Sequence, residues 1–140
     1  MMQVLYFAGS IRGGRQDSEI YGKLIAHLRN YGTVLTEHVG DNELLSQEKM
    51  MSEQEIFSRD MEWLRCTDVV VAEVSVPSLG VGYEIALAQT LGKKIVCLCR
   101  RSVGNLLSAM IAGNPALIIE RYDTLDEAKA LIDTHFMEKQ

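Results

Sequence analysis

The sequence predicts an α/β fold in which a doubly wound, five-stranded parallel sheet has helices on both faces, as in Rossmann-like and flavodoxin-like proteins. Short runs rich in β-branched and other apolar residues alternate along the chain with helical patterns. These runs are almost continuously apolar, which is typical of strands that helices shield from water on both sides. The expected strands are Val4–Ala8, Thr33–Thr36, Val69–Val74, Ile95–Leu98 and Ala116–Ile119.

Three segments outside these strands carry helix signals. Ile20, Leu24 and Leu28 recur at every fourth position, which places their side chains on one helical face. Ser52–Glu55 and Thr124–Glu127 have the spacing of a capping box, in which a hydroxyl and a carboxylate bond to the backbone at a helix start. The order strand, helix, strand is therefore expected to repeat along the chain.

Composition narrows the class of protein. The 140 residues are 47% hydrophobic and 24% charged, with no linker-like stretch, so we expect one domain spanning residues 1–140. The formal net charge of −5 disfavours a protein that coats nucleic acid, because such proteins need clustered cations. No apolar run approaches the roughly 20 residues of a membrane span, and no signal-peptide pattern begins the sequence. We expect a cytoplasmic protein that binds neither nucleic acid nor membrane.

The three cysteines, Cys66, Cys97 and Cys99, indicate neither a disulfide framework nor a metal site. They lack C-x-x-C spacing and have no histidine cluster nearby. Cys97 and Cys99 alternate along an expected strand, so both belong on one face of the sheet. We expect buried, reduced thiols.

The segment Gly9–Arg15 follows the first strand, and ligands of such folds bind beyond the carboxyl ends of the strands. Its glycines allow backbone N–H groups to approach an anion, while Arg12, Arg15 and a following helix N-terminus supply positive charge. The segment lacks both the glycine spacing of a dinucleotide fingerprint and the lysine of a Walker A motif. A phosphate site is therefore expected and a triphosphate is disfavoured, with a tight turn and solvated arginines as the alternative.

Glu84 follows the third strand and the segment Ser75–Gly82. A helix is expected to begin near Tyr83, which would place Glu84 in its first turn at the edge of the sheet. A carboxylate in this position is either a partner of the helix dipole or a site residue.

Asp60 lies on the expected helix from Glu53 to Arg65, among the residues of its apolar face. That face comprises Ile56, Phe57, Met61 and Leu64. An inward-facing carboxylate loses hydration, so Asp60 is either a structural acid bonded to the backbone or a site residue. His38 closes the second strand and is either an edge residue of the site or a surface histidine.

Five parts of the sequence carry a resemblance in combination: Leu5–Arg15, Gly32–Val39, Asp60 with Trp63 and Leu64, Asp68–Val74 and Pro77–Glu84. Together they closely resemble the 2′-deoxynucleoside 5′-monophosphate N-hydrolases, relatives of the nucleoside 2-deoxyribosyltransferases. The likeness runs from Tyr6 to about Met110. The resemblance implies a deoxynucleotide as small-molecule substrate, no cofactor, and hydrolysis of the N-glycosidic bond to give free base and 2-deoxyribose 5-phosphate.

The resemblance also implies roles for individual residues. Glu84 is the expected nucleophile, which attacks the anomeric carbon, and Tyr6 is expected to orient it. Asp60 is the expected second acid, which positions the substrate and assists departure of the base. Such carboxylates suit a reaction that builds oxocarbenium character on a sugar. The residues expected to hold the 5′-phosphate are Gly9, Ser10, Ile11, Arg12, Gly13, Ser78 and Gly80.

The resemblance further implies a homodimer. Ser108, within the segment Leu106–Met110, would reach the phosphate site of the opposite subunit, and Met110 is also expected among the substrate-binding residues. Two other functions remain possible from the sequence. A flavodoxin-like FMN reductase would use a similar Gly-Ser-x-Arg turn, although the chain is short and lacks evident aromatic loops for a flavin. A non-catalytic nucleotide-sensing dimer would bind the same ligand, although Asp60 and Glu84 argue against it.

Overall fold

The chain folds as a five-stranded, wholly parallel sheet in the order β2-β1-β3-β4-β5. The structure is a computed structural model, and it describes residues 2–11, 17–36, 39 and 49–137. The strands are β1 (Gln3–Ala8), β2 (Gly32–Val34), β3 (Val69–Glu73), β4 (Lys94–Arg100) and β5 (Ile118–Tyr122). The predicted fold class and the predicted number of parallel strands are confirmed.

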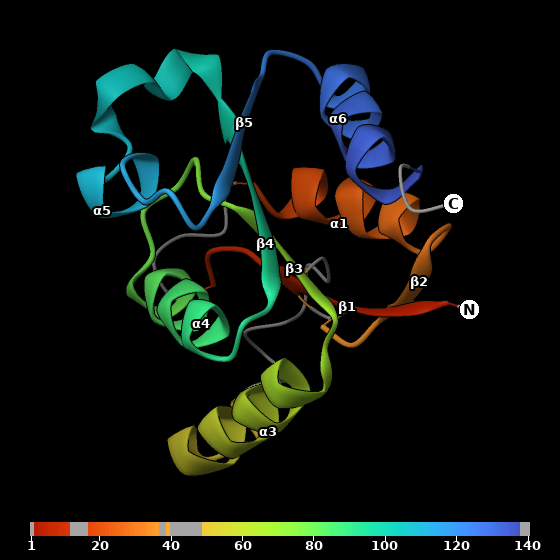
Figure 1. Cartoon of the computed structure of the whole chain (residues 1–140). Helices are drawn as coiled ribbons and strands as arrows, with labels where there is room; N and C mark the ends of the chain where they lie inside the picture. Colours follow the sequence, from red (N-terminus) through yellow and green to blue (C-terminus); the bar gives the residue numbers. More distant parts are fainter. Residues whose placement is uncertain (1, 12–16, 37–38, 40–48, 138–140) are drawn as a thin grey trace.

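Helices cover both faces of this sheet (Figure 1). One face carries α1 and α6, and the other carries α3 and α4. The helices are α1 (Ser18–Leu28), α3 (Glu53–Cys66), α4 (Leu79–Thr90), the short α5 (Ala109–Ala112) and α6 (Leu125–Met137), with a 3₁₀ helix η2 (Arg101–Leu106) after β4. Between β4 and β5 the chain therefore crosses over through η2 and α5 alone.

The alternation of side chains along the strands creates two cores. In β1, Leu5 and Phe7 pack beneath α1 and α6, whereas Tyr6 and Ala8 pack beneath α3 and α4. All four are buried. Neighbouring residues of one strand thus serve opposite faces, which is why the strands are apolar almost throughout.

The second strand is shorter than predicted, because a side chain replaces its last backbone contacts. The strand ends at Val34 rather than at Thr36. The Thr36 hydroxyl accepts a hydrogen bond from the Phe7 N–H and donates one to the Phe7 carbonyl, both at 2.7 Å. The buried Thr36 side chain therefore satisfies the backbone N–H and carbonyl of Phe7, as the backbone of a further strand residue would.

The boundaries of β4 and β5 also differ from the prediction. β5 begins at Ile118 rather than at Ala116, because Asn114 organises a turn in which its side chain accepts from the Ala116 N–H at 2.9 Å. β4 extends past Leu98 to Arg100, which pairs with Tyr122. At the carboxyl edge, both strands therefore continue past their apolar runs and include polar residues that the prediction left outside the sheet.

Helix α3 begins as predicted. Ser52 and Glu55 form the predicted capping box, with Ser52 Oγ accepting from the Glu55 N–H at 3.0 Å and Glu55 accepting from the Ser52 N–H at 2.8 Å. Thr124 Oγ1 likewise accepts from the Glu127 N–H at 3.2 Å. There the Glu127 carboxylate accepts from the Asp123 N–H instead of closing the box on Thr124.

The predicted start of α4 near Tyr83 is wrong. The helix begins at Leu79, and Ser78 caps it by accepting a hydrogen bond from the Val81 N–H at 3.3 Å. Glu84 therefore lies in the second turn rather than in the first. The two glycines before Tyr83 weaken the helical pattern by about 1 kcal/mol each, but the cap and the burial of Val81 favour the helix locally.

Helices α1 and α6 are joined at the amino edge of the sheet by Asp133. Its carboxylate accepts from the Tyr31 hydroxyl at 2.5 Å and contacts His27 Nε2 at 2.7 Å. Tyr31 also stacks on Phe136, with ring centroids 5.1 Å apart. His27 therefore has a structural contact, and so has His135, which contacts Glu120.

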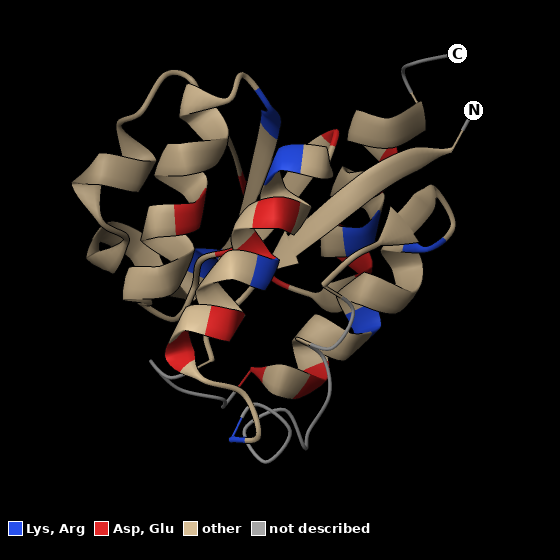
Figure 2. Cartoon of the chain, turned by 90° about the horizontal axis from the view of Figure 1, so that it is seen from below, with Lys and Arg blue, Asp and Glu red and all other residues tan. Residues whose placement is uncertain are grey.

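Charged residues of both signs are interspersed over the described part of the chain (Figure 2). No helix among the described residues is long and apolar enough to cross a membrane. Cys97 and Cys99 are buried free thiols, as predicted, but Cys66 is exposed at the end of α3.

We predict that Gly32→Ala lowers the free energy of unfolding by about 1–3 kcal/mol, because its Cβ would overlap the β1 backbone. An added Cβ would lie 2.0 Å from the Gln3 carbonyl oxygen. Gly82→Ala is the matched control: no atom lies within 4 Å of its added Cβ. The control should be neutral or stabilising by up to about 1 kcal/mol in urea unfolding. Equal midpoints for the two variants would contradict the tight β1–β2 contact.

Candidate functional site

The side chains of Tyr6 and Glu84 meet between β1 and α4. The Tyr6 hydroxyl donates a hydrogen bond to Glu84 Oε2. Burial, followed by the negative charges of Glu84 and Asp60, raises the pKa of Tyr6 far above its ordinary value. The hydroxyl therefore remains protonated and can hold the carboxylate of Glu84 over the whole physiological pH range.

A cavity of about 700 Å³ opens beside this pair. Its walls come from the loop after β1, from α3 and from the first turns of α4. It is lined by Gly9, Ile11, Glu53, Ile56, Phe57, Asp60, Met61, Ser78, Leu79, Gly80, Val81, Tyr83 and Glu84. Its volume is that of a site for a small ligand.

Asp60 reaches the cavity from the middle of α3. Its side chain is 18% exposed, and Arg59 Nε donates to Asp60 Oδ1 at 3.0 Å. The Arg59 guanidinium also lies 4.8 Å from the ring centroid of Trp63, a distance at which cation and ring attract each other. The prediction that Asp60 faces inward is confirmed, and the structure brings its negative charge near Tyr6.

The loop after β1 contributes Gly9 and Ile11 to the cavity. Ser10 is fully buried, and its N–H donates to the Tyr21 hydroxyl of α1 at 3.1 Å rather than facing the cavity. A Cβ at Gly9 would lie 2.8 Å from the Tyr21 ring, so only glycine fits against this ring. Arg12, Gly13 and His38 lie outside the described residues.

Ser78 and Gly80 lie at the start of α4 and line the same cavity. Ser78 is engaged as the helix cap, so its hydroxyl is held at the N-terminus of a helix of 12 residues. The N-terminal end of such a helix carries partial positive charge. This end of the cavity therefore favours an anionic ligand group.

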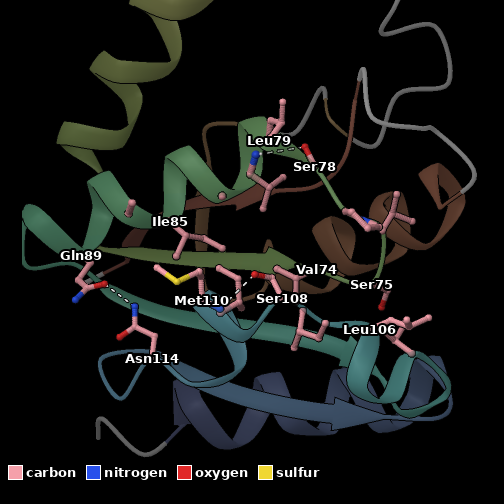
Figure 3. Close-up of a pocket in the computed structure, with 18 of the residues that line it drawn as sticks. Val74, Ser75, Ser78, Leu79, Ile85, Gln89, Leu106, Ser108, Met110 and Asn114 are labelled. Carbon is pink, nitrogen blue, oxygen red and sulfur yellow. Dashed lines mark hydrogen bonds between the residues drawn. The ribbon is translucent and has the colours of Figure 1, made fainter.

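Ser108 and Met110 do not line the cavity at Glu84. They line a second cavity of about 1020 Å³, between α4 and the segment that contains η2 and α5 (Figure 3). Ser108 Oγ accepts from the Met110 N–H at 3.2 Å. Gln89 and Asn114 bond to each other across its far end at 2.7 Å. Within one chain, Ser108 and Met110 thus lie outside the cavity at Glu84, and of the other predicted site residues only Ser78 lines both cavities among the described residues.

Sequence reasoning missed several apolar residues at the mouth of the first cavity. Phe57 was expected in the buried stripe of α3 but is 52% exposed, with its ring 6.2 Å from that of Tyr83. Leu79 is 97% exposed. A signal was available, because Glu53, Phe57 and Asp60 recur at spacings of four and three and so share one helical strip.

The geometry combines a carboxylate fixed by a tyrosine, a second carboxylate, and an anion-favouring helix start around one cavity. This arrangement suits attack on, or stabilisation of, an electron-poor carbon in a ligand that also carries a negative group. Among the described residues, no cluster of three or more His, Cys, Asp or Glu side chains could hold a metal ion.

Comparison with known proteins identifies the family of this chain. The family model of the nucleoside 2-deoxyribosyltransferases matches residues 5–116. The 5-hydroxymethyl-dUMP N-hydrolase of Rattus norvegicus is 50% identical over 132 residues, which cover 93% of this chain and 80% of that protein. The protein of the same name from Homo sapiens is 48% identical over 138 residues, covering 94% and 78%.

A solved structure supports the fold independently. The CMP N-glycosidase of Clostridium botulinum superposes with a TM-score of 0.70 at 21% identity, over 95% of this chain and 99% of that one. Since the family model spans most of the chain and the identity to these relatives is high, the chain belongs to the nucleoside 2-deoxyribosyltransferase family.

Proposed function

We propose that this protein hydrolyses the N-glycosidic bond of 2′-deoxynucleoside 5′-monophosphates, giving free base and 2-deoxyribose 5-phosphate. The observation that carries the proposal is the hydrogen bond from Tyr6 to Glu84 at the edge of a cavity that Asp60 enters from the opposite helix. The substrate class follows from the relatives, which are N-hydrolases of a deoxynucleoside monophosphate by name. Family membership argues against an FMN reductase.

In the proposed mechanism, a carboxylate oxygen of Glu84 attacks the anomeric carbon as the bond to the base breaks, and the electron pair of that bond leaves with the base. The developing positive charge on the sugar lies next to the Glu84 carboxylate, which stabilises it and then bonds to the carbon. Water next attacks the same carbon, and the ester bond to Glu84 breaks, which restores the carboxylate. The proton that water loses balances the proton that the departing base gains. Asp60 assists departure of the base, and Tyr6 keeps the nucleophile oriented.

The proposed phosphate site lies between the loop after β1 and the start of α4. Gly9, Ile11, Ser78 and Gly80 line the cavity there, and the α4 N-terminus favours an anion. Ser10 supports this loop through its bond to Tyr21. The proposal also assigns Arg12 and Gly13 to the phosphate and His38 to the edge of the site.

The proposed assembly is a homodimer in which Ser108 enters the opposite subunit's site, with Met110 beside it. Its support is an apolar surface around both cavities: Leu79, Leu106 and Met110 are 97%, 86% and 81% exposed. Exposed apolar side chains gathered in this way are typical of a surface that a partner covers. The dimer stays a prediction, and so does the cytoplasmic location expected from the sequence.

We predict that Glu84→Gln lowers hydrolysis by orders of magnitude while nucleotide binding persists, because the amide keeps the shape of the side chain but is a poor nucleophile. Release of free base from each of the four deoxynucleoside monophosphates is followed by chromatography, and binding is measured by calorimetry. Glu62→Gln, on the exposed side of α3, serves as control and should act like wild type. A Glu84→Gln rate within about tenfold of wild type would exclude Glu84 as the nucleophile. A wild-type protein that binds nucleotide without hydrolysing it would favour the alternative function of a non-catalytic nucleotide-sensing dimer.

We predict that Tyr6→Phe lowers kcat by roughly ten- to a hundredfold with a smaller change in KM. The variant keeps the buried ring but removes a charge-assisted hydrogen bond worth about 1.5–3 kcal/mol. Steady-state kinetics at pH 7 measures both constants, and thermal unfolding checks that the fold is intact. An unchanged kcat would show that the orientation of Glu84 does not depend on Tyr6.

We predict that two inactive variants, Glu84→Gln and Ser108→Glu, restore activity when their subunits are mixed. Ser108→Glu would set a carboxylate against the substrate phosphate of the opposite site, and like charges repel. In a mixed dimer one site contains both changes, whereas the other has an intact Glu84 and an intact Ser108 from the opposite chain. Random exchange makes about half of the dimers mixed, so activity should recover to roughly a quarter of wild type.

Tagged subunits establish that exchange has occurred, and size-exclusion chromatography establishes that each variant dimerises. Activity that stays at the sum of the two separate homodimers, despite proven exchange, would place Ser108 outside the opposite site. A monomeric wild-type protein with full activity would contradict the dimer itself.

A further inference from the structure

A cluster of buried polar side chains lies at the carboxyl edge of the sheet, on the face opposite Tyr6 and Glu84. Its centre is Glu73, the last residue of β3, which is fully buried beneath α1 and α6. Glu73 accepts hydrogen bonds from the Ser75 N–H at 2.8 Å, from the Ser75 hydroxyl at 2.9 Å and from the Tyr122 hydroxyl. The proposed reaction uses none of these groups.

Arg100 links this cluster to α1. Its Nη1 donates to Asp17 Oδ2 at 2.8 Å and lies 4.0 Å from Glu73 Oε2. Its backbone N–H donates to Ser75 Oγ at 2.9 Å. Burial raises the pKa of Glu73, while the bonds from Tyr122 and Ser75 and the charge of Arg100 oppose that rise. A buried carboxylate is costly unless it is bonded in this way.

Two series of contacts connect the cluster with residues that line or support the proposed phosphate site. Asp17 precedes α1, and one turn later Tyr21 donates its N–H to the Asp17 carbonyl at 3.0 Å. The Tyr21 ring supports Gly9, and its hydroxyl accepts from the Ser10 N–H. The second series begins at Ser75, which lies three residues before Ser78. Ser78 caps α4 and lines the cavity.

We propose that Glu73 is a positioning residue, which together with Arg100 and Asp17 sets the separation of the two chain segments that hold the 5′-phosphate. Ser75 fixes the segment that leads to Ser78, and Asp17 fixes the helix that supports Gly9 and Ser10. We call the three linked side chains of Glu73, Arg100 and Asp17 the clamp. Without the clamp the two walls of the site would lose their relative position, and the bound anion would lose contacts on one side. The inference rests on the proposed function only in taking the ligand to be a deoxynucleoside 5′-monophosphate.

The direction in which nucleotide affinity changes when the Glu73 charge is removed distinguishes a positioning role from a purely electrostatic one. A buried negative charge near an anion repels it, so removal of the Glu73 charge would tighten phosphate binding if charge alone mattered. A positioning role predicts the opposite, because the walls of the site would move apart. The two explanations therefore give changes of opposite direction in the affinity for a nucleotide.

The test compares Glu73→Gln and Asp17→Asn, which keep side-chain size, with Asp133→Asn. The control removes a carboxylate that also joins two elements, α1 and α6, but at the opposite edge of the sheet. Kinetic constants are measured for the best deoxynucleoside monophosphate and for its nucleoside, and unfolding temperatures for all variants. Inorganic phosphate, added as a competitor, reports on the anion site without sugar or base.

Both clamp variants should raise KM for the nucleotide and the inhibition constant of phosphate by about tenfold or more, as expected for lost charge-assisted contacts. The kcat/KM for the nucleoside should change by less than about threefold, and Asp133→Asn should lower the unfolding temperature without changing either affinity. If Glu73→Gln does not fold, Asp17→Asn decides, since its carboxyl group lies at the outer end of the clamp.

Tighter nucleotide binding, an unchanged KM, or an equal loss for nucleotide and nucleoside would overturn the positioning role. The dissociation constant of the nucleotide, measured by calorimetry in a Glu84→Gln background, separates this result from the fate of the proposed reaction. A wild-type protein that binds nucleotide without hydrolysing it would contradict the proposed function, yet the ratio of dissociation constants would still decide the role of Glu73. A wild-type protein that binds no nucleotide would overturn both.

Discussion

The parallel pairing of β1 with β3 joins two segments far apart in the sequence at the centre of the sheet, with Leu5 opposite Val69 and Ala8 opposite Ala72. Parallel strands end at the same edge, so this pairing brings the loop after Ala8 next to the segment after Glu73. The Tyr6–Glu84 contact, the walls of the first cavity and the Glu73 cluster all depend on it. A shift of one residue in this register would turn Tyr6 toward the wrong face.

The carboxyl edge of the sheet contains buried polar groups on both faces, whereas the middle of the sheet is apolar. Tyr6 and Glu84 meet on the face of α3 and α4, and Glu73, Arg100 and Tyr122 meet on the face of α1 and α6. Burial of charge opposes folding unless partners are in place. These groups therefore lower stability relative to an apolar edge, but their hydrogen bonds give the edge one defined geometry, which a site for a small polar ligand requires.

The first cavity has mostly apolar walls, among which carboxylates lie. Asp60 and Glu84 lie within it, and the exposed rings of Phe57 and Tyr83 lie at its mouth. A ring system such as a nucleobase can stack on aromatic side chains, while the carboxylates act on the attached sugar. The exposed Leu79 continues these apolar walls toward the second cavity, so the ligand surface and the proposed subunit surface adjoin.

The sequence alone determined the fold class, because apolar periodicity reports directly which residues avoid water. It also singled out Asp60 as a carboxylate within an apolar pattern and Glu84 as a carboxylate near a helix start, although their roles stay predictions. The capping box at Ser52 was predicted from residues three apart. The resemblance to a family was sufficient to pair Tyr6 with Glu84 before any geometry was known. What these inferences share is that each rests on neighbours along the chain or on a short motif.

Only the tertiary structure decided the remaining features. The start of α4 at Leu79, the replacement of strand contacts by the Thr36 hydroxyl and the exposure of Phe57 depend on which distant groups meet. The same holds for Glu73, which reads in sequence as one acidic residue ending an apolar strand. Its partners Arg100 and Tyr122 come from other strands, so their spacing along the chain carries no sign of the contact. Hydrogen bonds between side chains from separate strands depend on sheet order and register, and these are properties of the folded chain.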